Sequence, residues 1–360
     1  MTTDAPAPSS VWRARAFRLA KALTTPLLPE DYVDLFDPLR SPTHLRGRVR
    51  ELVAETDDAR TVVIQPGRGW AGHVPGQYLR IGVDIDGVRM WRAYSITSGP
   101  RDDGMVAITV KAITGGAVST HLVESLHVGQ LVQMEQADGE FVLPKVLPEK
   151  ILLLTGGSGI TPVMGILRHA IDQLDDVVLL HSAPRPEDVI FADELRELDD
   201  QGRIRLVERH TDTHGMLDTD ELERLVPDWR ERETWACGPA GMLEMIEKHW
   251  AATGTPHLLH TERFRPVTVE PGKGGTVYFT GLERELECDG ARPILDQGEE
   301  AGILMPSGCR MGICYGCVLP MREGTVRDLR NGEITTAQPG DGVLIQTCIN
   351  AAAGRCDLDL

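Results

Sequence analysis

The chain of 360 residues lacks several features that would place it in other protein classes. No apolar run approaches the roughly 20 residues that a membrane-spanning helix needs, and the amino terminus has no apolar signal-peptide core. Basic residues are few, because 37 of them against 54 acidic residues give a net charge of −17. This balance argues against nucleic acid as a partner, since phosphate binding needs a basic face. Seven cysteines are too sparse, and odd in number, for a disulfide framework.

The rest of the composition is that of an ordinary globular protein. Hydrophobic residues make up 41% and charged residues 25% of a chain that is long enough for two or three domains. Without a disulfide pattern, the cysteines point to a reducing cytoplasm. Residues 11–23 are a local exception, because they carry basic residues and no acidic one. We expect an amphipathic helix there, which either lies on an anionic membrane surface or packs on the protein body.

Four cysteines near the carboxyl end follow a recognisable spacing. Three of them form a Cys-x4-Cys-x2-Cys group and the fourth lies further on: Cys309, Cys314, Cys317 and Cys348. This is the plant-type ligand spacing for a 2Fe–2S cluster. A structural zinc site usually shows two paired cysteine knuckles, and only one such pair occurs here. The remaining cysteines of this region, Cys288 and Cys356, are expected to be structural.

Short strands with glycine and proline turns predict a closed or nearly closed antiparallel β-barrel over residues 43–147. The expected strands are Leu45–Glu55, Thr61–Gln65, Tyr78–Val83, Val88–Ser95, Met105–Ala112 and Leu131–Met134. Over residues 148–264 continuous apolar strands, Ile151–Thr155 and Val177–His181, are separated by a helical stretch, Pro162–Leu174. This alternation predicts a parallel α/β sheet.

The carboxyl-terminal part is predicted to be a separate domain. A linker over residues 265–275 leads into a segment, 276–360, that contains the cysteine group. We expect a hairpin (Thr276–Thr280 and Glu283–Cys288) and a helix (Ile294–Ala301) before that group. The chain is thus divided into an N-terminal extension (1–42), the barrel, the α/β domain, the linker and the cysteine domain.

The barrel carries a candidate site for a phosphate-bearing aromatic cofactor. Arg92 and Tyr94 lie two residues apart on one strand, so both side chains face the same way. A guanidinium there can bind a phosphate while the ring lies against an aromatic cofactor. Gly115 and Gly116 precede a short helical stretch, where free N–H groups and the Ser119 hydroxyl can bind a pyrophosphate.

The α/β domain carries two turns that are typical of nucleotide binding. Strand Ile151–Leu154 runs into the sequence Thr155–Pro162 and then a helix, which is the strand, glycine turn and helix N-terminus of a phosphate site. The glycines of this turn are Gly156, Gly157 and Gly159. No Lys-Ser or Lys-Thr pair follows, which excludes a P-loop. Further on, Cys237 ends a strand just before Gly238 and Pro239, at the edge where ligands bind.

These three motif sets, in this order, resemble the ferredoxin–NADP⁺ reductase superfamily with a C-terminal plant-type ferredoxin domain, over residues 43–360. The whole chain, including residues 25–32 and 227–232, is also similar to actinobacterial NADPH oxidoreductases that pass electrons to acyl-CoA Δ9-desaturases. The resemblance implies a multidomain fold. Its parts are an antiparallel β-barrel that binds FAD, a parallel-sheet α/β domain that binds the nucleotide, and an α+β (β-grasp) ferredoxin domain.

The same resemblance implies roles for the motif residues. Arg92, Tyr94 and Ser95 would hold FAD, with Ser95 near flavin N5, and Gly116 and Ser119 would hold its pyrophosphate. Residues that would receive the nicotinamide nucleotide are Gly157, Thr161, Cys237, Gly238 and Pro239, with Cys237 beside the reacting carbon. Phe264 would cover the other flavin face. Ser95, Thr161 and Cys237 are the residues expected at the hydride-transfer centre.

The choice of nucleotide is predicted from charges that follow two strands. Ser182 and Arg185 follow the second strand of the α/β domain, and three further arginines lie near the next strand: Arg203, Arg205 and Arg209. An arginine in this region favours the 2′-phosphate of NADPH, whereas a carboxylate favours NADH. Glu187 and Asp188 therefore leave NADH open.

Taken with the resemblance, the motifs predict an oxidoreductase that passes electrons from NADPH through FAD and a 2Fe–2S cluster to an oxygen-activating acceptor. The cofactors carry the chemistry and the protein positions them. The expected acceptor is a membrane-associated acyl-CoA desaturase. A Rieske dioxygenase, a diiron hydroxylase or a cytochrome P450 is an alternative acceptor. An alternative from another functional class is a redox-sensing or subunit-type electron conduit that never takes hydride from a free nucleotide.

Overall fold

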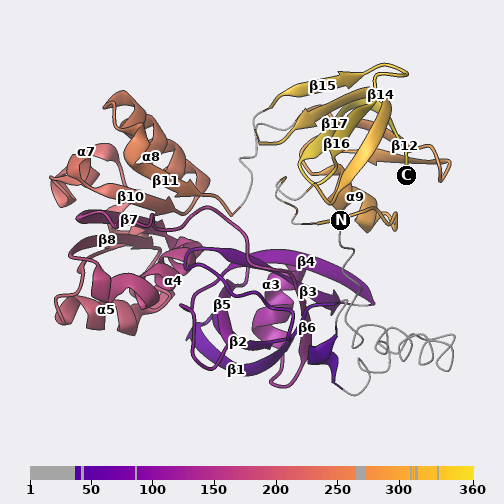
Figure 1. Cartoon of the computed structure of the whole chain (residues 1–360). Helices are drawn as coiled ribbons and strands as arrows, with labels where there is room; N and C mark the ends of the chain where they lie inside the picture. The colour runs from indigo at the N-terminus through magenta and orange to yellow at the C-terminus, as the bar shows by residue number, and fades with distance from the viewer. Residues whose placement is uncertain are drawn as a thin grey trace, which may run out of the picture.

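The computed structural model describes residues 37–41, 44–85, 87–264, 272–308, 310, 312, 315–330 and 332–360. These residues form three lobes, each built on its own β-sheet (Figure 1). The predicted helix over 11–23 and residues 265–271 of the predicted linker lie outside the described residues. Within the described ranges, no helix has the length and apolar character that crossing a membrane would require.

The first lobe is the predicted antiparallel barrel. Its strands are β1 (Arg46–Thr56), β2 (Ala59–Pro66), β3 (Tyr78–Ile85), β4 (Val88–Ser95), β5 (Val106–Lys111) and β6 (Leu131–Met134). They pair in the order β4-β3-β6-β1-β2-β5, and a bridge between Ile96 and Ile108 joins the two end strands. Helix α3 (Ala117–Thr120) continues into a wider turn, His121–Ser125, and packs Val118 and Leu122 into the barrel core.

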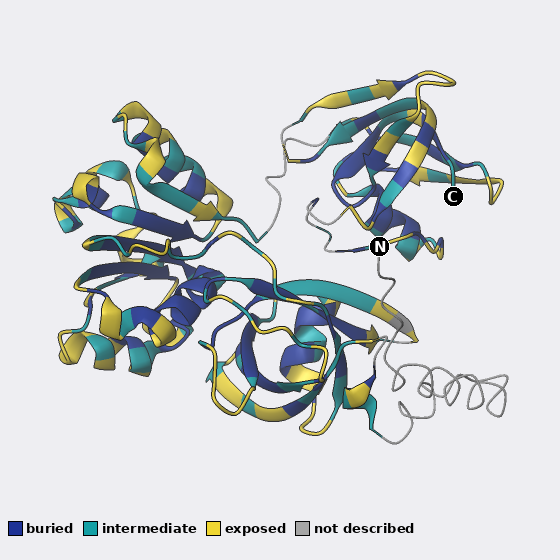
Figure 2. Ribbon diagram, viewed as in Figure 1, coloured by how far each residue is buried: buried dark blue, intermediate teal, exposed yellow. Residues whose placement is uncertain are grey.

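The second lobe is the predicted parallel sheet. Its strands are β7 (Lys150–Gly156), β8 (Asp176–Ala183), β9 (Arg205–His210), β10 (Glu233–Cys237) and β11 (Leu259–Glu262), in the order β11-β10-β7-β8-β9. Its helices are α4 (Ile160–Ala170), α5 (Ala192–Asp200), α6 (Thr211–His214), α7 (Thr219–Leu225) and α8 (Ala240–Ala252). Helices α4 and α5 cover one face, and α7 and α8 cover the other. The central strands are therefore buried on both faces (Figure 2), which explains their continuous apolar sequences.

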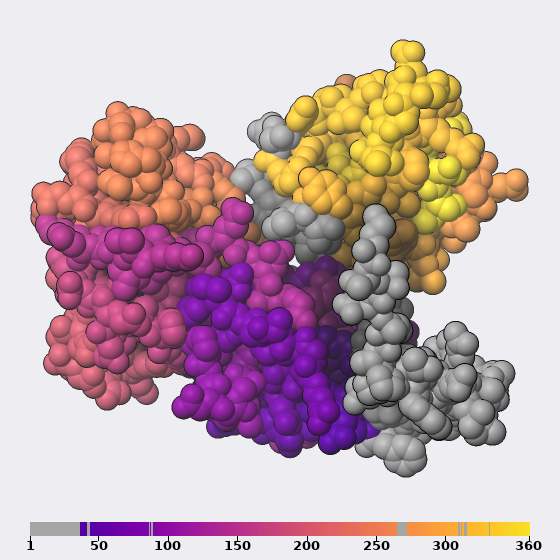
Figure 3. All heavy atoms as spheres, in the orientation of Figure 1, coloured from indigo at the N-terminus to yellow at the C-terminus, as the bar shows by residue number. Residues whose placement is uncertain are grey.

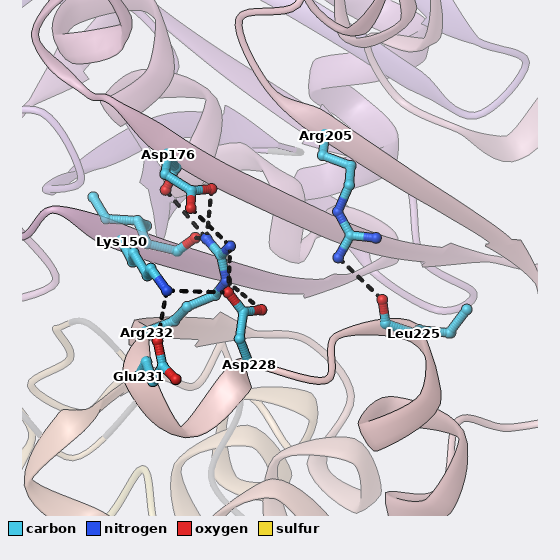
Figure 4. A network of polar contacts seen from close by, with 8 residues as sticks. Lys150, Asp176, Arg205, Leu225, Asp228, Glu231 and Arg232 are labelled. Atoms are coloured by element: carbon cyan, nitrogen blue, oxygen red, sulfur yellow. Dashed lines mark hydrogen bonds and ion pairs between the residues drawn. The ribbon is translucent and has the colours of Figure 1, made fainter.

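A network of ion pairs closes this sheet at the edge where its strands begin (Figure 4). The Arg232 guanidinium is 5% exposed and binds the carboxylates of Asp176 and Asp228 at 2.8–2.9 Å. Lys150, the first residue of β7, pairs with Glu231 at 2.5 Å. Because nucleotides bind at the carboxyl ends of parallel strands, this network supports the fold and stands away from the candidate site.

The third lobe is a mixed sheet with one helix packed on it. Its elements are β12 (Gly275–Phe279), β13 (Arg284–Cys288), α9 (Ile294–Glu300), β14 (Val318–Asp328), β15 (Ile334–Ala337), β16 (Val343–Gln346) and β17 (Asn350–Leu358). The strand order is β13-β12-β17-β14-β15, with β16 also on β14. Strands β12 and β17 run parallel and the other pairs antiparallel. Ile294 and Leu295 of α9 join the sheet's buried core, which agrees with the predicted α+β domain.

Candidate functional site

Strand β4 presents the predicted flavin-binding residues at its carboxyl end. The Ser95 side chain is 4% exposed, and its hydroxyl has no hydrogen-bond partner among the described residues. Burial raises the pKa of the neighbouring Tyr94 phenol, so this ring is neutral. Arg92 donates from Nη1 to the Trp91 carbonyl at 2.8 Å. A buried hydroxyl without a partner is costly, and a polar cofactor atom would satisfy it.

The predicted pyrophosphate turn has the geometry of a tight backbone cradle. Gly115 has a φ of +75°, which glycine adopts without strain. A Cβ on Gly116 would lie 2.4 Å from Ile113 Cγ1 and 2.5 Å from Ser119 Oγ. The Ser119 hydroxyl accepts from the Ile113 N–H at 3.3 Å and donates to the Gly116 carbonyl at 3.1 Å. Ser119 therefore shapes the turn, and a side chain at Gly116 would have to displace the side chains of Ile113 and Ser119.

The two predicted nucleotide turns pack directly on each other. Strand β7 ends at Gly156, and α4 begins at Ile160 after a single turn. A Cβ on Gly159 would lie 2.0 Å from the Cys237 carbonyl oxygen. A Cβ on Gly156 would lie 2.8 Å from Pro239 Cδ, and one on Gly238 would lie 3.0 Å from the Gly156 nitrogen. At Gly159 glycine is required because backbone meets backbone, whereas at Gly156 the close atom is the rigid ring of Pro239.

Helix α4 also connects this turn to the flavin strand. Thr161, in the first turn of α4, is 3% exposed and donates to the Ser158 carbonyl at 2.9 Å. One turn further, a Cβ on Gly165 would lie 2.3 Å from the carbonyl oxygen of Ile96, the residue after Ser95. Arg168 of the same helix donates to the Thr97 carbonyl at 2.8 Å. The helix that starts at the nucleotide turn is therefore fixed against the end of β4.

Cys237 has an ionisable neighbour that the sequence analysis did not assign. The Cys237 thiol is 0% exposed, and burial raises its pKa well above the ordinary value, so it is neutral. Glu262 of β11 lies beside Cys237 in register, and burial raises its pKa to about 8. Its Oε2 has no partner among the described residues. Phe264, two residues on, packs against the core of the second lobe. The neighbourhood of Cys237 and Glu262 is therefore uncharged.

The arginines predicted for nucleotide choice lie in different places. Arg203 binds Asp172 and the Ile171 carbonyl, both at 2.8 Å, and Arg205 donates to the Leu225 carbonyl at 3.0 Å. Both stand near the amino end of β9, the end of the sheet opposite to the predicted nucleotide turns. Arg185 is exposed and pairs with Asp188 at 3.0 Å and with Glu187 at 3.2 Å.

Arg209 is the arginine that lies at the carboxyl end of the sheet. It is 2% exposed, sits beside Ser182 in register, and forms an ion pair with Glu221. Its Nε and Nη1 and the Ser182 hydroxyl have no hydrogen-bond partner within the described ranges. Ser182 in turn lies beside Gly156. This buried cluster of unsatisfied donors is suited to an anion.

The cysteine region brings together the two predicted ligands that the structure describes. The sulfur atoms of Cys317 and Cys348 lie 3.1 Å apart, and both side chains are buried. A disulfide bond is about 2.05 Å long, so the two thiols are not bonded to each other. Contact with Cys348 lowers the pKa of the Cys317 thiol to about 6. Cys309 and Cys314 lie outside the described residues.

The described part of the cysteine loop is a series of tight turns. Arg310, Gly312 and Tyr315 all have positive φ, of 59°, 77° and 55°. Gln346 donates to the Gly312 carbonyl at 3.0 Å, and the Thr347 hydroxyl donates to the Cys317 carbonyl at 3.0 Å. These hydrogen bonds tie the described residues Gly312 and Cys317 to the segment that precedes Cys348. Cys288 and Cys356 lie in the core, where burial raises their pKa to about 11 and about 12.

Charges of the third lobe face the flavin strand. Arg310 is held by Asp296 at 2.7 Å and by Glu299, both on α9. Burial lowers the pKa of Arg92, the Arg310 cation lowers it further, and the two α9 carboxylates raise it. Figure 1 shows α9 at the end of the third lobe that points toward the barrel. Arg310 and the two α9 carboxylates therefore lie close enough to the predicted flavin strand for their charges to act on Arg92.

One further cleft lies between the barrel and the second lobe. It has a volume of about 880 Å³ and a rim that includes Glu51, Glu187 and Arg196. Apart from Glu187, which was considered for nucleotide choice, none of the residues predicted from sequence lines it. The three lobes are seen as separate blocks of colour in Figure 3.

Comparison with known proteins agrees with this architecture. Family models match in order: an oxidoreductase FAD-binding domain over residues 57–143, an oxidoreductase NAD-binding domain over 153–248, and a 2Fe-2S iron-sulfur cluster binding domain over 277–352. A curated NADPH oxidoreductase of Mycobacterium tuberculosis is 46% identical over 351 residues, which cover 95% of this chain and 91% of that protein. The chain belongs to this family of three-domain oxidoreductases. It carries FAD-binding, NAD(P)-binding and 2Fe–2S domains.

Other relatives of this reductase are components of oxygenase systems. The ferredoxin reductase component of the 3-ketosteroid-9-alpha-monooxygenase of Mycolicibacterium smegmatis is 30% identical, covering 86% of this chain and 94% of that one. The solved structure of phthalate dioxygenase reductase matches 88% of this chain and 98% of its own length with a TM-score of 0.63. At 21% identity this match shows the fold alone, and it confirms the predicted arrangement of three domains.

Proposed function

We propose that this reductase takes hydride from NADPH and delivers single electrons, through FAD and a 2Fe–2S cluster, to an oxygen-activating acceptor protein. The observation that carries the proposal is the contact of Gly159 with the Cys237 carbonyl. This contact joins the two nucleotide turns at the carboxyl edge of the sheet, and Gly165 fixes the same helix on the residue after Ser95. A redox conduit without hydride chemistry would have no use for this arrangement.

At the hydride-transfer centre the protein contributes shape and neutrality. Bound FAD supplies the chemistry that converts a two-electron donor into two single-electron steps. Ser95, whose hydroxyl has no partner among the described residues, would donate to the flavin, and Cys237 and Thr161 would border the nicotinamide. Burial raises the pKa of the Cys237 thiol, so this side chain would border the nicotinamide without a charge. Burial likewise raises the pKa of the adjacent Glu262 to about 8.

The remaining assignments follow the geometry of each turn. For FAD they are Arg92, Tyr94, Gly115, Gly116, Ser119 and Phe264, with Phe264 against the flavin face. For the nucleotide phosphates and ribose they are Gly156, Gly157, Gly159, Gly238 and Pro239. We assign the 2′-phosphate of NADPH to Ser182 and Arg209, because their unsatisfied donors are adjacent and buried. Arg185 remains a second candidate, although two carboxylates of its own loop already occupy it.

For the iron–sulfur centre we propose Cys309, Cys314, Cys317 and Cys348 as ligands. Two of these residues are described, and their convergence supports the assignment. We also propose the functional boundaries 43–147 for the FAD domain, 148–264 for the nucleotide domain, 265–275 for the linker and 276–360 for the ferredoxin domain, after an extension of residues 1–42.

As acceptor we propose a membrane-associated acyl-CoA desaturase. The support is the resemblance of the sequence to actinobacterial NADPH oxidoreductases that pass electrons to such desaturases. The 46% identity to an NADPH oxidoreductase of M. tuberculosis, against 30% for the steroid monooxygenase component, agrees with that resemblance but does not itself name an acceptor. A cytoplasmic protein with a basic helix over residues 11–23 would meet such an acceptor at the membrane surface. An oxygenase acceptor is the second candidate, because several relatives are reductase components of monooxygenases.

The test is reconstitution with each class of acceptor. Purified reductase and NADPH are mixed with an acyl-CoA desaturase in anionic vesicles, or with a Rieske-type terminal oxygenase, and product is measured. Desaturated product that depends on both NADPH and the reductase is the expected result. If the reductase supports turnover of the oxygenase but not of the desaturase, the desaturase assignment is contradicted. If the reductase reduces cytochrome c with neither NADPH nor NADH as the donor, the proposed hydride reaction itself is contradicted.

A further inference from the structure

Arg330 lies outside every motif of the sequence analysis and is directed at the cysteine loop. It follows the end of β14, and the preceding residue, Leu329, donates its N–H to the Ile349 carbonyl at 2.7 Å, next to Cys348. A Cβ on Gly312 would lie 2.8 Å from Arg330 Nη1 and 2.8 Å from Ile349 Cδ1. The guanidinium therefore packs on the backbone between Cys309 and Cys314.

Asp328 holds this guanidinium in one orientation. Arg330 donates from Nη2 to Asp328 Oδ2 at 2.7 Å and from Nε to Oδ1 at 3.1 Å, while its own N–H donates to Oδ1 at 2.8 Å. The carboxylate side chain is only 14% exposed. Asp328 raises the pKa of Arg330, and Cys348 and Tyr315 add to this shift. Because Nη1 faces the loop and the other nitrogens face Asp328, the positive end of the pair is the end that meets the loop.

Arg310 is placed differently. It belongs to the loop itself, its side chain is 9% exposed, and two carboxylates of α9, Asp296 and Glu299, bind it. Arg330 is 40% exposed and has one carboxylate partner. Among the described residues, the charge of Arg310 is thus opposed by two carboxylates, whereas that of Arg330 is opposed by one.

We propose that Arg330, oriented by Asp328, is a positioning residue that stabilises the added electron on the iron–sulfur cluster and so raises its reduction potential. Charge and hydrogen bonds around the ligand sulfurs set the potential of such clusters. Reduction adds one negative charge at the loop, and a fixed cation there favours the reduced form. The inference rests on the proposed ligand set, because it needs the cluster to be bound by this loop.

The experiment is a redox titration of the full-length holoprotein with a chemical reductant, followed by the electron paramagnetic resonance signal of the reduced cluster. Arg330→Gln leaves Asp328 unbalanced and is expected to shift the midpoint potential to more negative values. Asp328→Asn leaves the cation unbalanced and is expected to shift it to more positive values. Arg322→Gln is the matched control, because Arg322 pairs with Asp359 and lies six residues, roughly 20 Å, before Asp328 on β14. It should titrate as the wild type does.

Three outcomes overturn the inference: an unchanged potential in Arg330→Gln, an equal shift in the Arg322→Gln control, or no positive shift in Asp328→Asn. If Arg330→Gln does not retain a cluster, Asp328→Asn decides, and Arg330→Lys, which retains the cation, should keep the potential near that of the wild type. Failure of the ligand set itself would look different, because the wild-type protein would then show no 2Fe–2S signal. The titration uses neither NADPH nor an acceptor, so it does not depend on those assignments.

Discussion

The contact between the two nucleotide turns makes a sharp prediction for Gly159→Ala. The added methyl would lie 2.0 Å from the Cys237 carbonyl oxygen and 2.4 Å from its carbon, where ordinary contact begins at 3.4 Å. Both atoms belong to the backbone, so no side chain can rotate away. The turn and the end of β10 must therefore separate by about 1 Å or more. Such overpacking costs about 1–3 kcal/mol of stability.

The effect on function should be larger than the effect on stability. A displacement of this size at a reacting centre costs roughly 100-fold in rate. We expect reduction of the flavin by NADPH, followed by stopped-flow absorbance at the flavin band, to slow by about that factor, with FAD still bound. Gly69→Ala is the control, because its Cβ would meet only Leu45 Cδ1, at 3.8 Å. Flavin reduction at the wild-type rate in Gly159→Ala would refute the proposal that the packing of the two nucleotide turns positions the nicotinamide for hydride transfer.

Three further predictions address charge. Arg209→Gln should raise the KM for NADPH and leave the KM for NADH unchanged. Arg185→Gln should change neither KM strongly. If instead Arg185→Gln raises the KM for NADPH and Arg209→Gln does not, the 2′-phosphate is to be assigned to Arg185. Arg232→Ala leaves Asp176 and Asp228, whose side chains are 45% and 33% exposed, without their buried partner and should cost about 1.5–3 kcal/mol in denaturant unfolding, with an unchanged KM for NADPH. Glu262 has a pKa raised from 4.5 to about 8, so the folded protein binds the extra proton and stability falls as pH rises across that window. Thermal melts from pH 5 to 9 should therefore fall less steeply for Glu262→Gln than for the wild type, and parallel curves would contradict the shift.

Local patterns in the sequence predicted the elements well because each element has its own period and its own turn chemistry. Strands β4 and β6 have the predicted bounds, and β7 and β8 each extend one or two residues beyond them. The α4 helix begins two residues before Pro162 and ends earlier, at Ala170, where the chain continues as a single tighter turn. Glycines in the turns were informative because close backbone approach leaves no room for a side chain.

What the sequence could not predict depends on pairing between distant strands. Glu262 meets Cys237 only because β11 pairs with β10 in that register. Arg203, Arg205 and Arg209 are equivalent in the sequence, yet only Arg209 lies at the carboxyl end of its strand and beside Ser182. Arg330 reaches Gly312 because β14 and β17 bring their ends together at the cysteine loop. Alternating strand periods say which face a residue occupies, but not which neighbour it meets.

The most direct test of the central claim is an anaerobic single-turnover experiment with the wild type and a Cys348→Ser variant. One equivalent of NADPH is mixed with each protein, and the flavin absorbance and the cluster signal are followed together. In the wild type the flavin should bleach first and then partly recover as the cluster becomes reduced. In Cys348→Ser the flavin should bleach at the wild-type rate and stay reduced, without a cluster signal. An intact, NADPH-reducible cluster in Cys348→Ser, or a cluster that is reduced before the flavin, would contradict the account.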